Sequence, residues 1–362
     1  MLSRWNKIRQ AFILAGVVVC AAVLCPAAAG GLLEENCEKE LQKTVQELVA
    51  FGDRSVGTEG NKAAALYLQK KLAEIGLEVA LQGGELQNVV GLLKGTNAAP
   101  REVLIVGAHY DSAKKSPGAT DNGAGVAIVL EQARLLSRLS FAYDIKFAFW
   151  NGEELGGKGS KAYVKEAVEK KEPIALYLNY DSVGFDTGKC LLDLMHNNLS
   201  EKIAKWVVEI NEQYKLGYTL SQNTKKCFSD HRPFWDAGFC ALMFHCSDHG
   251  PAHTPKDTAD QVSYAYAWKN AKLGLILLSE WNNFLTRRHP PSPRLRWTGR
   301  EHRGDLFLTG FIGLRIFPAE AQPASLKSYA EPGRRRGDFL PQGTQRTQGK
   351  DVSQMQNKAF RI

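Results

Sequence analysis

Five side chains of types that bind divalent metals stand at the ends of short apolar runs or in the loops after them: His109, Asp121, Glu154, Asp181 and His253. Open α/β sheets assemble their sites at the carboxyl ends of the strands, so we expect these side chains to converge. Imidazole nitrogens and carboxylate oxygens both coordinate Zn²⁺. Five such donors, rich in carboxylate, suit two ions about 3.5–4 Å apart with one carboxylate bridging them. The sequence therefore predicts a two-zinc hydrolytic centre.

Asp121 is the expected bridge, because Gly118, Gly123 and Gly125 allow the backbone around it to approach the metals closely. Asp111 lies two residues after His109. Its carboxylate is placed to accept a hydrogen bond from the imidazole nitrogen that does not face the metal, the usual way of orienting such a ligand.

Glu153 and Glu154 are adjacent and directly follow an apolar run, 147–150. Neighbouring side chains in extended backbone point to opposite sides. We therefore expect Glu154 to hold metal while Glu153 faces the attacking water as the general base. A glutamate pair is usually a solvated surface feature, but surface pairs seldom follow a buried strand.

Apolar periodicity places these residues in an α/β fold. Strands are predicted at 88–95, 103–106, 145–150, 174–181 and 239–245. Helices are predicted at 38–51, 62–75, 161–171 and 264–285. Two further helices are expected, one capped by Asp121 or Asn122 and one capped by Ser200. This alternation predicts a three-layer sandwich, in which helices cover both faces of a mixed, mostly parallel sheet. We expect residues 30–285 to form one domain.

Six motifs, in this order along the chain, resemble those of the M28 family of zinc aminopeptidases. They are Gly-Ala-His-Tyr-Asp-Ser at 107–112, Gly-Ala-Thr-Asp-Asn-Gly-Ala-Gly at 118–125, Gly-Glu-Glu-Leu-Gly at 152–156, Asn-Tyr-Asp at 179–181, Ser-Asp-His at 229–231 and His-Thr-Pro-Lys-Asp-Thr at 253–258. The resemblance covers roughly residues 38–285 and implies an exopeptidase domain with two zinc ions. It assigns the five ligands named above, with Glu153 as the base and Asp111 orienting His109.

The chain departs from the pattern of that family in two ways. No gap between the motifs would hold the protease-associated domain that some members insert. The segment 286–362 matches nothing in the family pattern.

The charge of the chain is unevenly distributed. The net charge is +8, but residues 30–285 carry 28 basic and 32 acidic residues, whereas residues 286–362 carry 15 basic and 6 acidic ones. The body is therefore mildly acidic, which argues against a nucleic-acid surface. The basic tail has a proline-rich start and a polar end, and it is expected to be disordered. Weak contact with a membrane or another anionic surface is a second interpretation of the tail.

The N-terminus is typical of an export signal. Arg4, Lys7 and Arg9 precede an apolar run at 11–24, and Ala27-Ala28-Ala29 form a small-residue cleavage site. We expect residues 1–29 to be removed and the protein to be secreted or periplasmic; an uncleaved membrane anchor is the alternative. After cleavage five cysteines remain, Cys37, Cys190, Cys227, Cys240 and Cys246. One disulfide among the last three and a set of buried thiols are both compatible with this spacing.

These observations favour an exported, monomeric metalloaminopeptidase acting on peptides with a free N-terminus. His231 and His245 are candidates to stabilise the tetrahedral oxyanion. One alternative is a single-zinc glutaminyl cyclase, since such enzymes share a His-Tyr-Asp-Ser sequence and a Gly-Glu-Glu. A two-metal carboxypeptidase or deacylase and an inactive binding ectodomain are further alternatives. The complete set of five ligands together with Glu153 favours the aminopeptidase.

Overall fold

The computed structural model describes residues 31–98, 101–223, 228–248 and 250–288. The predicted signal peptide, Cys227 and the tail from residue 289 onward lie outside the described residues. None of the helices in the described ranges combines the length and the hydropathy that a membrane crossing requires.

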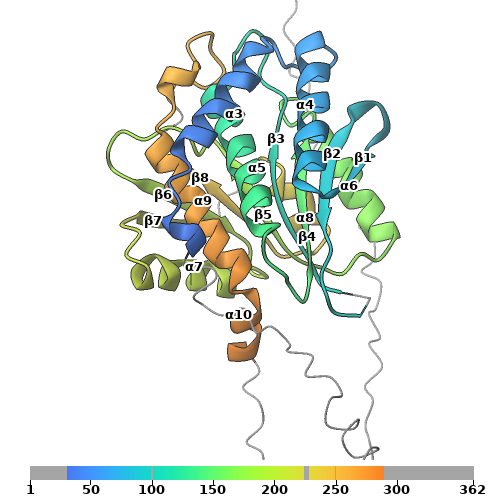
Figure 1. The fold of residues 1–362 in the computed structure, drawn as a ribbon, viewed down its shortest axis with the longest axis vertical. Helices are drawn as coiled ribbons and strands as arrows, with labels where there is room; N and C mark the ends of the chain where they lie inside the picture. Colours follow the sequence, from blue (N-terminus) through green and yellow to red (C-terminus); the bar gives the residue numbers. More distant parts are fainter. Residues whose placement is uncertain (1–30, 99–100, 224–227, 249, 289–362) are drawn as a thin grey trace, which may run out of the picture. The chain divides into compact units, whose positions relative to one another are not determined.

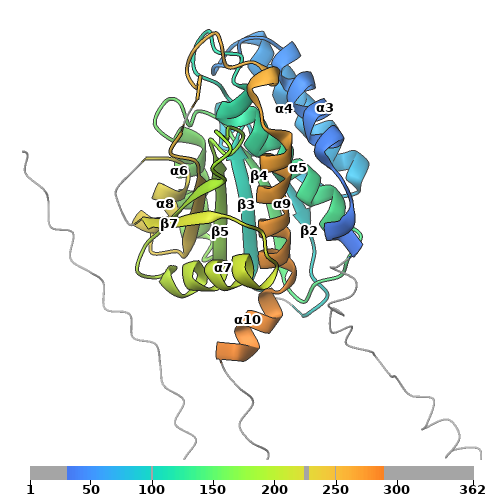
Figure 2. The same cartoon turned by 90° about the vertical axis from the view of Figure 1, so that its left-hand side faces the viewer.

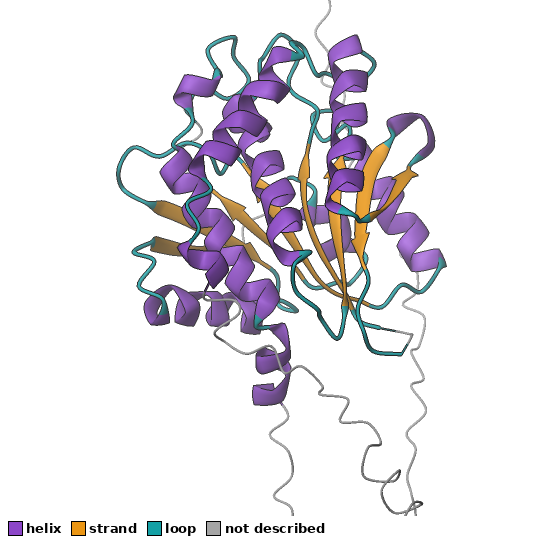
Figure 3. Ribbon diagram, viewed as in Figure 1, coloured by secondary structure: helices purple, strands orange, loops and turns teal. Residues whose placement is uncertain are grey.

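The described residues form one eight-stranded mixed sheet in the order β1-β2-β4-β3-β5-β8-β6-β7 (Figure 1, Figure 3). The strands are β1 (Glu78–Gln82), β2 (Asn88–Leu93), β3 (Val103–His109), β4 (Asp144–Trp150), β5 (Ile174–Asp181), β6 (Leu191–His196), β7 (Thr219–Asn223) and β8 (Ala241–His245). The four central strands β4, β3, β5 and β8 run parallel, so their carboxyl ends meet at one edge.

Helices cover both faces of this sheet, as the view turned by 90° shows (Figure 2). The helices are α3 (Glu38–Ala50), α4 (Glu59–Ile75), α5 (Ala124–Leu136), α6 (Lys158–Glu169), α7 (Glu201–Gln213), α8 (His231–Asp236), α9 (Tyr264–Ser279) and α10 (Trp281–Arg288), with short helical turns at Gly84–Leu86, Ala119–Gly123 and Ala259–Gln261. One hydrophobic core joins α3, α4, α5, α7 and α9 to the sheet, and a second joins α6 and α8 to the opposite face. The predicted three-layer α/β sandwich is confirmed.

Local sequence explains several of these boundaries. Helix α4 begins where Thr58 accepts a hydrogen bond from the Asn61 backbone N–H, and it ends at Gly76 in the left-handed conformation, as the sequence predicts. Strands β3 and β5 lack polar alternation because both of their faces are covered by helices.

Three helix predictions differ from the structure. Asp121 and Asn122 do not cap α5, which begins after Gly123, so Asp121 is available to the site. Ser200 stands at the start of α7, but its hydroxyl donates to the Ala241 carbonyl at 2.7 Å instead of capping the helix. The single closing helix at 264–285 is divided at Glu280 into α9 and α10, and α10 continues to Arg288, past the predicted end of the domain at 285.

The cysteines give only part of an answer. Cys37, Cys190 and Cys246 are free thiols, so the disulfide pairings that include Cys246 are not formed. The Sγ atom of Cys240 lies 3.3 Å from the Leu199 carbonyl oxygen. Because Cys227 lies outside the described residues, its pairing with Cys240 stays a prediction.

Candidate metal centre

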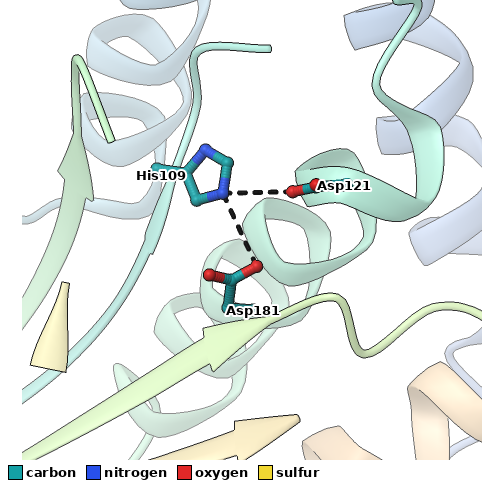
Figure 4. Close-up of side chains that lie close together, drawn as sticks. All are labelled: His109, Asp121 and Asp181. Atoms are coloured by element: carbon teal, nitrogen blue, oxygen red, sulfur yellow. Dashed lines mark ion pairs between the residues drawn. The ribbon is translucent and has the colours of Figure 1, made fainter. Parts of the chain in front are cut away.

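The strand ends bring His109 and Asp181 together, as predicted. The Nε2 atom of His109, at the end of β3, lies 3.2 Å from Asp121 Oδ1 and 3.6 Å from Asp181 Oδ1 at the end of β5 (Figure 4). These three side chains are buried, and their ligand atoms lie within 4.8 Å of one another. This spacing suits one divalent cation held by an imidazole and two carboxylates.

A second cluster uses the other oxygen of the same aspartate. The Nε2 atom of His253 lies 2.9 Å from Asp121 Oδ2 and 3.3 Å from Glu154 Oε2. Asp121, Glu154 and His253 again hold their ligand atoms within 4.8 Å of one another. All five predicted ligands are therefore brought together. Asp121 offers one oxygen to each cluster, which is the arrangement of a bridging carboxylate.

The backbone around Asp121 is held by Asp257, to which the sequence analysis gave no role. The carboxylate of Asp257 accepts hydrogen bonds from Thr120 N and Thr120 Oγ1, both at 2.7 Å, and from Asp121 N at 3.2 Å. Gly118 precedes this loop with φ of 66°, and a Cβ atom there would lie 2.7 Å from Ser112 Cβ. A glycine is required at this position by both its conformation and its space.

Arg54 is a fully buried cation beneath the site that the sequence analysis missed. Its guanidinium donates to the carbonyl oxygens of Tyr110 at 3.0 Å, Pro117 at 2.6 Å and Gly118 at 2.9 Å. Burial lowers the pKa of Arg54 to about 10, against the opposing effect of Asp111 and Asp257, so it stays charged at neutral pH. It fastens the end of β3 to the loop that carries Asp121.

Asp111 contacts His109 through both its side chain and its backbone. The Nδ1 atom of His109 lies 3.1 Å from the Asp111 carbonyl oxygen and 3.5 Å from its carboxylate Oδ1. The two carboxylate oxygens also accept hydrogen bonds from the backbone N–H groups of Glu153 and Glu154, each at 3.2 Å. Asp111 therefore contacts His109 as predicted, and its side chain in addition fixes the turn that presents the two glutamates.

Asp181 is held by a series of hydrogen bonds between buried side chains. The motifs contain some of these residues, but the sequence did not predict the contacts between them. Ser229 Oγ donates to Asp181 Oδ2 at 2.5 Å and accepts from Asn179 Nδ2 at 2.8 Å. Tyr177 donates to Asn179 Oδ1 at 2.7 Å and accepts from Trp150 Nε1 at 2.7 Å. These buried partners restrict the rotamer of Asp181, as hydrogen bonds to metal-binding carboxylates commonly do.

The two glutamates occupy different environments, as the prediction of separate roles requires. Glu154 belongs to the second cluster, and burial raises its pKa to about 7. Glu153 belongs to neither cluster but lines the cavity next to them. Burial raises the pKa of Glu153 to about 9, with His109 opposing and Asp181 adding to the shift. Cations bound at the two clusters would lower this pKa, so that Glu153 is present as the carboxylate that accepts a proton.

The electrostatics of the clusters fit a bound cation. Burial alone would lower the pKa of His109, but the carboxylates of Asp111, Asp121 and Asp181 outweigh it and raise that pKa well above its ordinary value. Within the described residues, Glu154 Oε1 is buried without a hydrogen-bond partner. Buried carboxylates that exceed the available positive side chains are stabilised by metal ions. The donor set of two imidazoles and three carboxylates fits zinc.

A cavity of about 370 Å³ opens beside the clusters. Its lining residues are Asp121, Glu153, Asp181, Ser182, Asp193, Met195, Phe228, Met243, His245, Ser247 and His253. A larger hollow of about 640 Å³ lies between β1, β2 and α6, and none of the five ligands lines it. We assign the chemistry to the smaller cavity because it contains the buried ionisable groups.

The two histidines proposed for the oxyanion lie in different places. His245, at the end of β8, lines the cavity, and its Nδ1 lies 3.1 Å from the Asp181 carbonyl oxygen. His231 is buried outside the cavity, and its ring packs edge-on against Trp235 with centroids 4.3 Å apart. Among the described residues, neither ring nitrogen of His231 has a hydrogen-bond partner. The geometry therefore favours His245.

Comparison with known proteins identifies the family. The profile of peptidase family M28 matches residues 88–277, just over half of the chain. The chain belongs to peptidase family M28. It is 33% identical over 216 residues to the aminopeptidase YwaD of Bacillus subtilis, and the match covers 58% of this chain and 47% of YwaD. The matches to the first curated relatives cover from 20% to 47% of their lengths.

Solved structures share the fold of this M28 chain. The zinc aminopeptidase BSAP from Bacillus subtilis is 20% identical with a TM-score of 0.61, covering 67% of this chain and 95% of that one. The glutaminyl cyclase of Fimbriiglobus ruber is 18% identical with a TM-score of 0.58, covering 67% and 94%. Both reactions named for these proteins therefore occur on this fold, and the site must discriminate between them.

Proposed function

We propose that this M28 protein is a zinc-dependent aminopeptidase that hydrolyses the N-terminal residue from peptides. The observation that carries the proposal is Asp121, which offers one oxygen to His109 and the other to His253 while Glu153 lines the same cavity. The aminopeptidase names of the curated relative YwaD and of the structural neighbour BSAP support it.

His109, Asp121, Glu154, Asp181 and His253 would hold two zinc ions, which would lower the pKa of the attacking water and polarise the scissile carbonyl group. A carboxylate oxygen of Glu153 accepts the proton from that water and delivers it to the nitrogen of the leaving amine. His245 is the cavity residue that donates a hydrogen bond to the developing oxyanion. Asp111 and Ser229 hold Glu153 and Asp181 in position for these steps.

The acidic lining of the cavity supports cleavage at the N-terminus of the substrate peptide. Two carboxylates of its lining, Glu153 and Asp193, lie outside the metal clusters, and no Lys or Arg lines it among the described residues. Such a cavity attracts the positively charged α-amine of a peptide. An internal peptide segment has no such charge, so we expect removal of single residues and no endoproteolysis.

A glutaminyl cyclase is the second candidate, because that reaction occurs on the same fold. The complete five-residue set, in two clusters that share Asp121, favours the aminopeptidase over a single-zinc cyclase.

A peptide with N-terminal glutamine separates the two reactions. We expect mass spectrometry to show loss of whole N-terminal residues, blocked by a chelator and by acetylation of the α-amine. Loss of ammonia from an intact chain would instead establish the cyclase. An unchanged peptide, from a preparation that carries zinc, would contradict both and favour a binding role.

We also propose that the protein is exported and acts as a monomer. The basic residues Arg4, Lys7 and Arg9, followed by the apolar run at 11–24, support cleavage after Ala29. N-terminal sequencing of the mature protein tests this, since an intact Met1 in an exported product would favour a membrane anchor. The basic segment 289–362 supports weak contact with anionic surfaces, which binding to anionic vesicles at low and high salt would test.

A further inference from the structure

Asp193 is a carboxylate in the cavity that neither metal binding nor proton transfer uses. It lies on β6, a strand that the sequence analysis did not predict. In the sheet Asp193 is paired with His245, and His245 is paired with Asp181. Side chains of residues paired in this way point to the same face of a sheet. Asp181, His245 and Asp193 therefore form one row across the sheet, with His245 in the middle and Asp193 at the end farther from the metal clusters.

The carboxylate of Asp193 is held in place by two hydroxyl groups and has no cationic partner among the described residues. The hydroxyls of Ser221 and Ser247 donate hydrogen bonds to its two oxygens. A carboxylate has about four acceptor positions, so these two bonds leave about half of its capacity unused. Across the described parts of the chain, no Lys or Arg lies within ion-pair distance of Asp193. An oriented, half-buried anion in a substrate cavity is suited to bind a cation.

The floor beside Asp193 is apolar. Met195 and Met243 are paired between β6 and β8, and both are buried cavity residues. Phe228, 48% exposed, supplies an aromatic ring to the same cavity. An apolar surface that ends at a carboxylate matches a side chain with a hydrocarbon stem and a charged tip, since lysine and arginine pack their stems on apolar surfaces.

The distances along the sheet agree with this match. Asp193 and Asp181 are separated by two strand spacings, about 10 Å. An extended lysine side chain spans about 6 Å from Cα to Nζ, from five bonds of about 1.5 Å. A substrate whose α-amine lies beside Asp181 and the metals therefore extends a lysine or arginine side chain past His245 and alongside the methionine pair to Asp193. A short side chain does not reach it.

We propose that Asp193 is a specificity-determining residue that selects peptides with lysine or arginine at the N-terminus. This inference rests on the proposed aminopeptidase function and names its substrate class. The favourable interaction is a charge-assisted hydrogen bond from the substrate ammonium or guanidinium group to the carboxylate held by Ser221 and Ser247.

The kinetic test compares N-terminal lysine with norleucine, its uncharged analogue, in otherwise identical peptides on the zinc-loaded enzyme. We expect kcat/KM to favour lysine by about 10–100-fold, the value of one charged hydrogen bond. In Asp193→Asn the lysine-to-norleucine ratio should fall to near one. Asp236→Asn is the matched control, because it removes an exposed carboxylate paired with Arg232 on α8, outside the cavity. A wild-type preference for norleucine, or an unchanged ratio in Asp193→Asn, would overturn the proposal.

A binding measurement keeps this test separate from the proposed function. Calorimetry with L-lysine hydroxamate and L-norleucine hydroxamate on the zinc-loaded protein requires no turnover. Tighter binding of the lysine compound, lost in Asp193→Asn and kept in Asp236→Asn, would support Asp193 even if no peptide were cleaved. Equal Kd values for the two compounds would overturn the role of Asp193, even if peptides were cleaved.

Discussion

Ser229 donates a hydrogen bond through its Oγ to Asp181 Oδ2 at 2.5 Å, and both residues are buried. The same hydroxyl accepts a hydrogen bond from Asn179 Nδ2, and Asn179 Oδ1 in turn accepts one from the buried hydroxyl of Tyr177. Asp181, at the end of β5 and in the first cluster, is thus oriented by a residue that precedes α8 and belongs to neither cluster.

Ser229→Ala should therefore weaken zinc binding by about 10–100-fold, the usual effect of removing a hydrogen bond behind a metal ligand. The measurement is competition for zinc against a chelator of known affinity. Ser137→Ala is the control, because among the described residues that hydroxyl donates to the Arg134 carbonyl at the end of α5 and lies outside the site. Equal zinc affinity in Ser229→Ala and wild type would show that Asp181 is held by the backbone alone.

Arg54→Met should destabilise the fold as well as the site. The substitution leaves the carbonyl oxygens of Tyr110 and Pro117 without the guanidinium donor, whereas the Gly118 carbonyl keeps the backbone N–H of Gly123 at 2.9 Å. Each unsatisfied buried acceptor costs about 1–3 kcal/mol, so we expect a loss of about 2 kcal/mol or more in the free energy of unfolding. Urea denaturation of the metal-free protein measures this.

Arg138→Met is the control for Arg54, because Arg138 is a surface arginine whose ion pair with Glu35 is solvent-exposed. Exposed pairs contribute about 0–1 kcal/mol. If both variants lost the same small amount of stability, the hydrogen bonds of Arg54 would not stabilise the contact between the end of β3 and the Asp121 loop.

Glu153→Gln should retain both zinc ions and lose activity. Glu153 lies outside the two metal clusters, so the change removes the proton acceptor without removing a ligand. General-base catalysis contributes about 10²–10⁴-fold, and kcat should fall by at least that factor. Zinc analysis on the same sample separates this result from metal loss. Near-normal kcat in a zinc-loaded variant would exclude Glu153 as the base.

His231 should make the metal-free protein less stable in acid. Burial lowers the pKa of His231 to about 3, although Asp181 acts in the opposite direction. Below the ordinary pKa of histidine, about 6.5, the unfolded chain binds a proton that the folded chain excludes. The stability contributed by the neutral ring is present above that pH and is lost as the pH falls toward 3.

His231→Phe preserves the aromatic contact with Trp235 and removes the titration. Between pH 6 and pH 4 the wild type should lose about 1.4 kcal/mol per pH unit more than this variant. Urea denaturation of both proteins in a chelator gives the comparison. Parallel stability curves would mean that His231 takes up its proton in the folded state.

The sequence predicted the parts of the structure whose signals are local. The apolar runs of β3, β4, β5 and β8 predicted the parallel core, and the acidic and histidine residues after them predicted the five side chains that the structure brings together in two clusters. Periodicity did not reveal β6 and β7. The two strands pair with each other at one side of the sheet, and polar residues such as Asp193 and Ser221 interrupt their apolar character.

Residues that act through long-range contacts left no local signal. Arg54 is a single arginine in the loop before α4, and its function depends on carbonyl groups of residues 110, 117 and 118, which only the folded chain brings near. Asp193 enters the cavity only because β6 pairs with β8. The prediction of a single closing helix was also wrong. The chain has no proline or glycine at Glu280 that would have indicated the break between α9 and α10.

The most direct test of the account is a zinc titration of chelator-stripped protein, with bound zinc and the residue released from an N-terminal lysine peptide measured on the same samples. For a two-zinc aminopeptidase we expect saturation at about two zinc ions per chain, with release of the N-terminal residue rising as the sites fill. His253→Ala should bind one ion fewer and lose activity. Saturation at a single zinc ion that His253→Ala leaves unchanged, or peptide cleavage that persists in the chelator, would contradict the two-metal aminopeptidase.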